Sequence, residues 1–64
     1  MNFEQLLATY LGRTVEVFLE DEFFTGQLIF VGNGFFTLSE TQGYYAPVEL
    51  NILNTQAIYV RVLM

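Results

Sequence analysis

The stretch LGRTVEVFL, residues 11–19, marks the point where the hydrophobic period of this chain changes. Before Gly12, apolar residues recur with the spacing of an amphipathic helix. After it, Val15, Val17 and Leu19 occupy every second position, which is typical of a half-buried β-strand. The stretch therefore predicts a short N-terminal helix followed at once by a β-rich domain.

The predicted helix spans residues 2–11. Asn2 is suited to cap its start, and Gln5 three residues later completes a capping box. Gly12 supplies a left-handed stop. Because so short a helix is marginal in isolation, we expect it to pack against the rest of the chain and to cover one open end of a barrel. Its apolar stripe consists of Phe3, Leu6, Leu7, Tyr10 and Leu11.

Five short strands with close turns are predicted after the helix. Gly26 interrupts the second strand, where we expect a sharp bend. Pro47 has no N–H to donate, so its part of the fourth strand is an edge or a bulge. Together they predict one mainly β domain over residues 1–64, a strongly bent five-stranded antiparallel small barrel of the SH3-like type. The predicted strands are residues 14–20, 23–31, 35–39, 44–53 and 56–63, with Gly32-Asn33-Gly34 as the strongest turn signal.

Size and charge restrict the classes of function. The chain has 64 residues, 53% of them hydrophobic, with no cysteine and no histidine. A domain this small buries only about 60% of its unfolded surface, so we expect copies of the chain to cover one another. The net charge is −5, with Arg13 and Arg61 as the basic residues, which disfavours general nucleic-acid binding. The lack of a long apolar run and of a basic N-terminus predicts a cytoplasmic protein without a membrane partner.

Catalytic chemistry is not indicated. Glu20-Asp21-Glu22 lacks the spacing of a calcium loop, so a solvated acidic turn is predicted. Ser39 and the threonines have no histidine or lysine to activate them. We therefore predict that the chain is not an enzyme, has no catalytic residue and holds no metal or cofactor.

Several motifs occur in an order that resembles one known superfamily. Residues 11–19 look like its first strand, and Gly26-Gln27-Leu28 resembles the Gly-x-Leu of its bent second strand. Residues 35–38 match its apolar third strand, and residues 52–60 resemble its second motif. On these residues the chain resembles a divergent small member of the Sm-like (Lsm) superfamily.

The resemblance implies a homo-oligomeric ring. In Sm-like proteins the fourth strand of one subunit pairs with the fifth strand of the next, which implies here a ring of about five to seven subunits. Many members bind single-stranded, uridine-rich RNA through two loops in the ring. The candidate interface residues in this chain are Tyr44, Tyr45, Val48, Leu50, Ile58, Val60 and Val62.

The RNA loops of the family are not preserved. Gly32, Gly34 and Phe36 stand where the family has an aspartate, a base-stacking residue and an asparagine. Leu53-Asn54-Thr55 replaces its Arg-Gly-Asp/Asn. The usual uridine pocket cannot be carried over, so RNA binding is expected to be weak or lost. The polar residues left as candidate pore or ligand positions are Asn33, Asn54, Thr55 and Gln56.

A base-stacking platform of aromatics is disfavoured, because the basic groove that such platforms need is missing. Two alternatives remain open from the residues alone. A monomeric or dimeric SH3-like module could bind a peptide through its aromatics, or an accessory structural protein, for example of a phage, could contact other proteins. The aromatics that we instead predict as core or subunit interface are Phe18, Phe24, Phe30, Phe36, Tyr44 and Tyr45.

Overall fold

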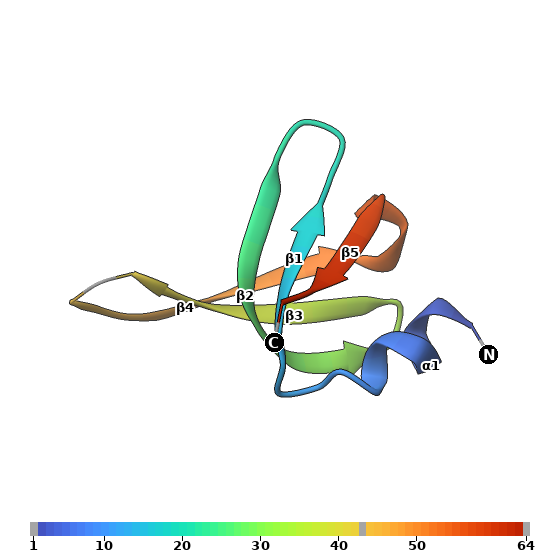
Figure 1. The fold of residues 1–64 in the computed structure, drawn as a ribbon, viewed down its shortest axis with the longest axis horizontal. Helices are drawn as coiled ribbons and strands as arrows, with labels where there is room; N and C mark the ends of the chain where they lie inside the picture. The colour runs from blue at the N-terminus through green and yellow to red at the C-terminus, as the bar shows by residue number, and fades with distance from the viewer. Residues whose placement is uncertain (1, 43, 64) are drawn as a thin grey trace.

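A bent antiparallel sheet and one short helix make up the fold. The computed structural model describes residues 2–42 and 44–63. The strand order is β4-β3-β2-β1-β5, with every neighbouring pair antiparallel (Figure 1). The mainly β class and the order of elements are thus confirmed. The elements are α1 (Phe3–Ala8), β1 (Thr14–Phe18), β2 (Phe23–Gly32), β3 (Phe35–Gln42), β4 (Tyr45–Leu53), a 3-10 turn η1 (Asn54–Gln56) and β5 (Tyr59–Val62).

Helix α1 starts as predicted but ends earlier. The Oδ1 atom of Asn2 accepts the N–H of Gln5 at 2.7 Å, and the Gln5 side chain accepts the N–H of Asn2 at 3.1 Å. The helix stops at Ala8, and the hydroxyl of Thr9 donates to the carbonyl of Leu6 at 2.7 Å. Tight turns then carry the chain to residue 12.

Strand β2 bends because its two halves serve different partners. Residues 23–27 pair with β1, whereas residues 27–32 pair with β3, with an irregular register between Leu28 and Phe30. Gly26 lies where β3 comes closest: a Cβ there would lie 2.8 Å from the carbonyl oxygen of Ser39. The expected bend is present, and the glycine is required by close backbone approach and not by a left-handed dihedral.

Strand β4 forms one edge of the sheet and carries the irregularity predicted for Pro47. Its pairing with β3 shifts between Glu40↔Val48 and Gln42↔Tyr45, so Pro47 lies within a bulge of an edge strand. Because the ring nitrogen of proline cannot donate, this is a position where its missing hydrogen bond costs little.

The core combines buried side chains of α1, β1, β2, β3 and β4. Leu7 of the helix is 3% exposed and anchors it to this core. Thr37 is a buried polar residue, and its hydroxyl donates to the Oδ1 atom of Asn51 at 2.7 Å. The buried hydrophobic side chains are Leu7, Val15, Val17, Leu28, Phe36, Leu38 and Ile52.

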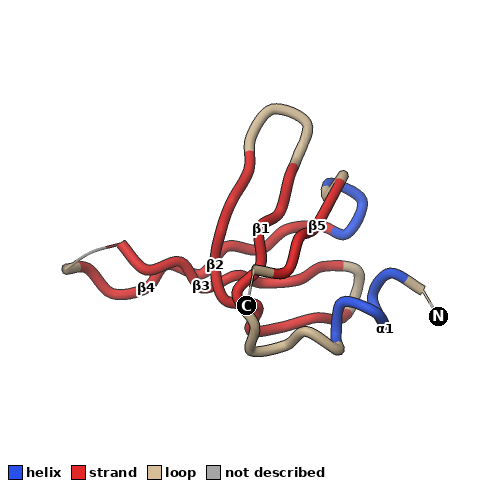
Figure 2. The backbone as a smooth tube through the Cα atoms, viewed as in Figure 1, coloured by secondary structure: helices blue, strands red, loops and turns tan. Residues whose placement is uncertain are grey.

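The sheet is open, which corrects the predicted barrel. Strands β4 and β5 each pair with a single neighbour, and the register of the described residues contains no β4–β5 pairing. Figure 1 shows the reason: β4 leaves the body with β3 as a projecting hairpin, while the short β5 lies alongside β1. Figure 2 shows the β1–β2 loop projecting separately from that hairpin. Helix α1 therefore covers a sheet face and not a barrel end.

The aromatic side chains divide between the core and the surface. Phe36 is fully buried and Phe24 packs partly against the core, as predicted. Phe30 is 39% exposed and stacks on Phe35, with ring centroids 5.1 Å apart. Phe18 lies on the outer face because it alternates with the buried Val17. Phe18 and Phe30 are therefore not core residues of the single chain.

Candidate functional site

The two loops predicted to form a ligand site meet in the structure. The backbone N–H of Asn54, at the start of η1, donates to the carbonyl of Gly34 in the β2–β3 turn at 2.9 Å. Asn33 has a φ of 57° and Gly34 a φ of 85°, which confirms the tight turn predicted there. The turn and the 3-10 segment thus form one surface at the end of the sheet.

Glu4 of α1 joins this surface and was not predicted. Its Oε2 atom accepts the N–H of Gly34 at 2.9 Å and the Nδ2–H of Asn54 at 3.1 Å. These three residues, Glu4, Gly34 and Asn54, are called the loop junction below. Sequence patterns did not single out Glu4, because a carboxylate in a first helical turn is common and its partners lie 30 and 50 positions away.

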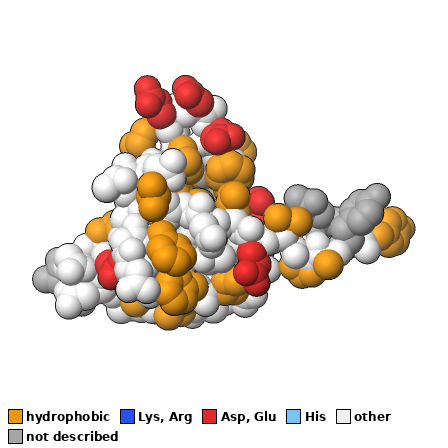
Figure 3. Space-filling model, turned by 180° about the vertical axis from the view of Figure 1, so that it is seen from behind, with side chains coloured by type: hydrophobic (Ala, Val, Ile, Leu, Met, Phe, Trp, Pro, Cys, Tyr) orange, Lys and Arg blue, Asp and Glu red, His pale blue; other side chains and the backbone are white. Residues whose placement is uncertain are grey.

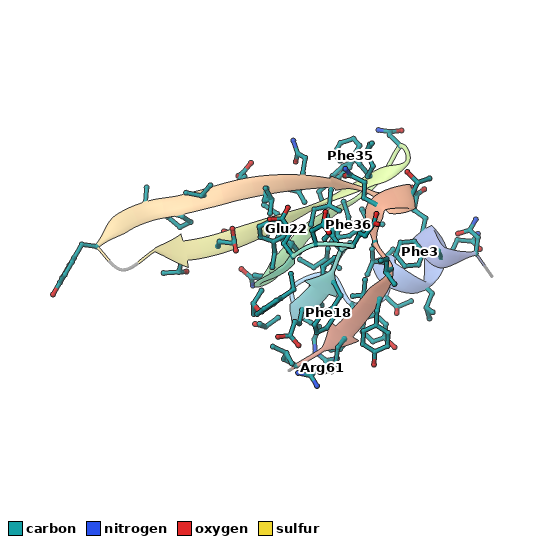
Figure 4. All side chains as sticks on the ribbon, turned by 90° about the horizontal axis from the view of Figure 1, so that it is seen from above. Phe3, Phe18, Glu22, Phe35, Phe36 and Arg61 are labelled. Atoms are coloured by element: carbon teal, nitrogen blue, oxygen red, sulfur yellow. The ribbon has the colours of Figure 1, made fainter. Side chains whose placement is uncertain are left out.

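The loop junction is rich in hydrogen-bond acceptors. The Oδ1 atom of Asn54 is buried and has no hydrogen-bond partner among the described residues. An open depression beside it is lined in part by Asn2, Phe3 and Thr55. Phe3 also contacts the buried Phe36, with ring centroids 6.3 Å apart (Figure 4). Such a surface suits donor groups and repels phosphate, because a carboxylate stands at its centre.

The other predicted ligand residues have different surroundings. Gln56 is committed to its own turn, since its Oε1 atom accepts the N–H of Leu53 at 3.1 Å. Thr55 is exposed and borders the depression. Asn33 is exposed at the tip of its turn. Of the four predicted positions, Asn54 is the one that the loop junction holds with hydrogen bonds.

The predicted interface residues lie along the two sheet edges. Tyr44 is fully exposed beside β4, Val48 is 43% exposed and Ile58 is 70% exposed. Leu50, Val60 and Val62 are partly buried and pack against the core. The side chain of Tyr45 lies outside the part of the structure that is described.

An apolar groove separates α1 from the free edge of β5. Phe3 and Leu6 line it from the helix and Tyr10 from the turn after it. From the strand it is lined by Tyr59, Val60 and Val62. Phe3 and Leu6 are 43% and 48% exposed, so the hydrophobic stripe of α1 is only half used within the chain. The stripe that we expect to pack against the rest of the chain therefore remains partly uncovered.

Within residues 2–42 and 44–63, no group of three or more Asp or Glu side chains could hold a metal ion. The described helices are too short to cross a bilayer. Comparison of the chain with family models, curated proteins and solved structures found no match in any of the three.

Proposed function

We propose that this chain is an Sm-like scaffold protein that assembles with copies of itself into a ring and has little or no affinity for RNA. The observation that carries the proposal is the strand order, which leaves β4 and β5 each with one free edge at opposite ends of one sheet. Unpaired edges are templates for further pairing. Because the two edges differ, pairing of β4 with β5 is head-to-tail, and head-to-tail contacts that close give rings.

The apolar surfaces beside these edges support the same assembly. The α1–β5 groove and the exposed Val48 and Ile58 are surfaces that a neighbouring subunit would cover. Covering about 500 Å² of apolar surface per subunit would contribute roughly 12 kcal/mol before association costs. A chain of this size gains stability from such association, because its own core consists of few side chains.

Weak RNA affinity follows from charge and from the loop junction. The net charge of −5 per subunit is repeated around a ring, so an RNA strand approaches a repelling field. In this proposal Glu4 stands at the junction of the two loops and adds a carboxylate there. No catalytic step is part of the proposed function, and a cytoplasmic location remains a prediction.

The mass of the native particle tests the proposed assembly. Light scattering after size-exclusion chromatography should give about five to seven times the chain mass of 7.4 kDa. A monomer at micromolar concentration contradicts the proposal and favours the second candidate, a protein-interaction module. That candidate is supported by aromatic side chains such as Phe23 and Tyr59, which are more than half exposed.

RNA binding is tested separately with labelled uridine and adenine oligomers. Fluorescence anisotropy at low salt, where charge interactions are least screened, should show no submicromolar binding. Submicromolar affinity that is lost in Asn54→Ala or Gln56→Ala would show that the loops form an RNA site from neutral groups, and would overturn this part of the proposal.

A further inference from the structure

We propose that the outer face of β5, β1 and β2 binds an arginine-containing segment of a partner protein. The surface consists of a row of aromatic rings below an acidic hairpin tip. It lies on the face opposite the core and apart from the loop junction. The proposal does not depend on ring assembly, and the experiment below distinguishes the failure of one from the failure of the other.

The aromatic row consists of Phe23, Phe18 and Tyr59, one from each of three neighbouring strands. Phe18 is the register partner of both others, Phe23 on β2 and Tyr59 on β5. Its ring centroid lies 5.7 Å from each of theirs, with interplanar angles of 31° and 54°. Phe23 is 58% and Tyr59 57% exposed, so this row presents ring faces and edges to solvent.

An acidic hairpin tip lies beyond one end of the aromatic row. The acidic tip, Glu20-Asp21-Glu22, is exposed directly beyond it at the β1–β2 turn. Figure 3 shows acidic side chains gathered at this tip.

The cation on this face is already paired. Arg61 lies two positions along β5 from Tyr59 of the aromatic row, and its Nη2 atom donates to the Oε1 atom of Glu16 at 2.7 Å. Counting Glu16 and the acidic tip, the surface carries four carboxylates against one guanidinium, a net charge of −3. The row therefore combines exposed π faces with a local excess of negative charge.

Arginine matches both features. A guanidinium group stacks on an aromatic face and is attracted by the ring quadrupole, and its planar fork pairs with carboxylates. Phosphate-bearing ligands are repelled by the same charges. A second copy of this chain is a poor occupant, because Arg13 and Arg61 are its only basic residues and Arg61 is engaged with Glu16.

Titration with synthetic peptides tests the proposal. The probe is a fluorescein-labelled peptide of alternating arginine and serine, followed by anisotropy with the full-length protein at about 20 and 200 mM NaCl. Binding should be detectable at low salt and weaken at high salt. Phe23→Ser and the double variant Asp21→Asn, Glu22→Gln should each weaken it about fivefold or more. A peptide with citrulline in place of arginine, which lacks the positive charge, should bind the unaltered protein at least as weakly as the arginine peptide binds these variants.

Matched variants keep the result specific. Phe30→Ser removes an exposed aromatic and Glu49→Gln an exposed carboxylate on β4, and both should leave peptide affinity unchanged. Absence of binding up to millimolar peptide at low salt overturns the proposal, as does equal affinity in all variants. Loss of native mass in Phe23→Ser would assign the row to contact between copies and also overturn it. A change in native mass that occurs only in variants of the β4 or β5 edge tests the proposed ring and leaves the peptide proposal unaffected.

Discussion

The two edge strands of the sheet, β4 and β5, differ in length, in regularity and in the surface beside them. Strand β4 is long, contains Pro47 within a bulge, and continues into a projecting hairpin. Strand β5 has four residues, no proline, and an apolar groove between it and α1. Proline and bulges discourage strand addition, whereas a regular edge next to an apolar groove invites it.

In the proposed assembly the two edges pair with each other and not with themselves. A pairing of β5 with another β5 would leave the long β4 edge of both copies uncovered. Pairing of β4 with β5 covers one edge of each kind at every contact, and the residues of β4 beyond Pro47 have about the length that β5 requires. The predictions below test this asymmetry, from the largest expected effect to the smallest.

An aspartate introduced on β5 should affect both folding and assembly, whereas one introduced on β4 should affect assembly alone. Val60 packs against the core, so Val60→Asp should destabilise the folded chain by about 3 kcal/mol or more and also prevent assembly. Val48 is 43% exposed, so Val48→Asp should leave the melting transition of the monomer intact and reduce the native mass. Circular dichroism and light scattering measure the two properties. Equal loss of folding in both variants would show that the edges do not differ as described.

The bend that separates the two edges should depend on Gly26. A Cβ at this position would lie 2.8 Å from the backbone oxygen of Ser39, so Gly26→Val should cost about 3 kcal/mol and lower the yield of folded protein sharply. Gly34→Ala is the matched control. Its φ of 85° is strained but no atom lies within 4 Å of its Cβ position, so it should cost about 1 kcal/mol. An unchanged melting temperature in Gly26→Val would contradict the close approach of β3.

Glu4 should stabilise the segment that connects β4 to β5. Glu4→Ala leaves the N–H of Gly34 and the Nδ2–H of Asn54 without this acceptor, and we expect a loss of about 1–2 kcal/mol in urea unfolding. Glu4→Gln retains an acceptor oxygen and should lose less. Glu49→Ala, an exposed carboxylate on β4, should stay within about 0.5 kcal/mol of the parent. If Glu49→Ala has the larger effect, the loop junction is not a stabilising contact.

The ion pair between β1 and β5 should matter least. Arg61 is 57% exposed and Glu16 14% exposed, so solvent screens much of their attraction. Arg61→Ala should therefore cost at most about 1 kcal/mol in unfolding free energy, and the cost should shrink in high salt. A larger, salt-insensitive loss would mean that the side chain of Arg61 stabilises the β5 edge by packing and not by charge.

Local patterns in the sequence predicted the elements but not all of their limits. The capping box at Asn2, the period-two alternation from Thr14 and the turn at Asn33 all concern neighbours a few positions apart, and all are confirmed. The helix ends at Ala8, before the predicted residue 11, and hydrogen bonds between residues three apart carry the chain on to Gly12. The apolar spacing of residues 2–11 fits either kind of turn.

Contacts between residues that are far apart in the sequence could not be predicted from local patterns. Glu4 contacts Gly34 and Asn54 across 30 and 50 positions, and no pattern in the sequence marks it. Phe18 is predicted as core or subunit interface, and in the single chain it is not a core residue. Only the strand register shows that it lies between Phe23 and Tyr59 on the outer face. The identity of a face depends on which neighbour covers it, and that is a tertiary property.

The sequence by itself determined a small β-rich domain with one capped helix, a bend near Gly26 and an edge at Pro47, because period, capping and backbone restrictions act locally. Only the tertiary structure decided that the sheet stays open, that Glu4 joins two loops, and that three aromatic rings align across β2, β1 and β5. These features depend on strand register and on the direction in which β2 bends, which bring together residues that are remote in the chain.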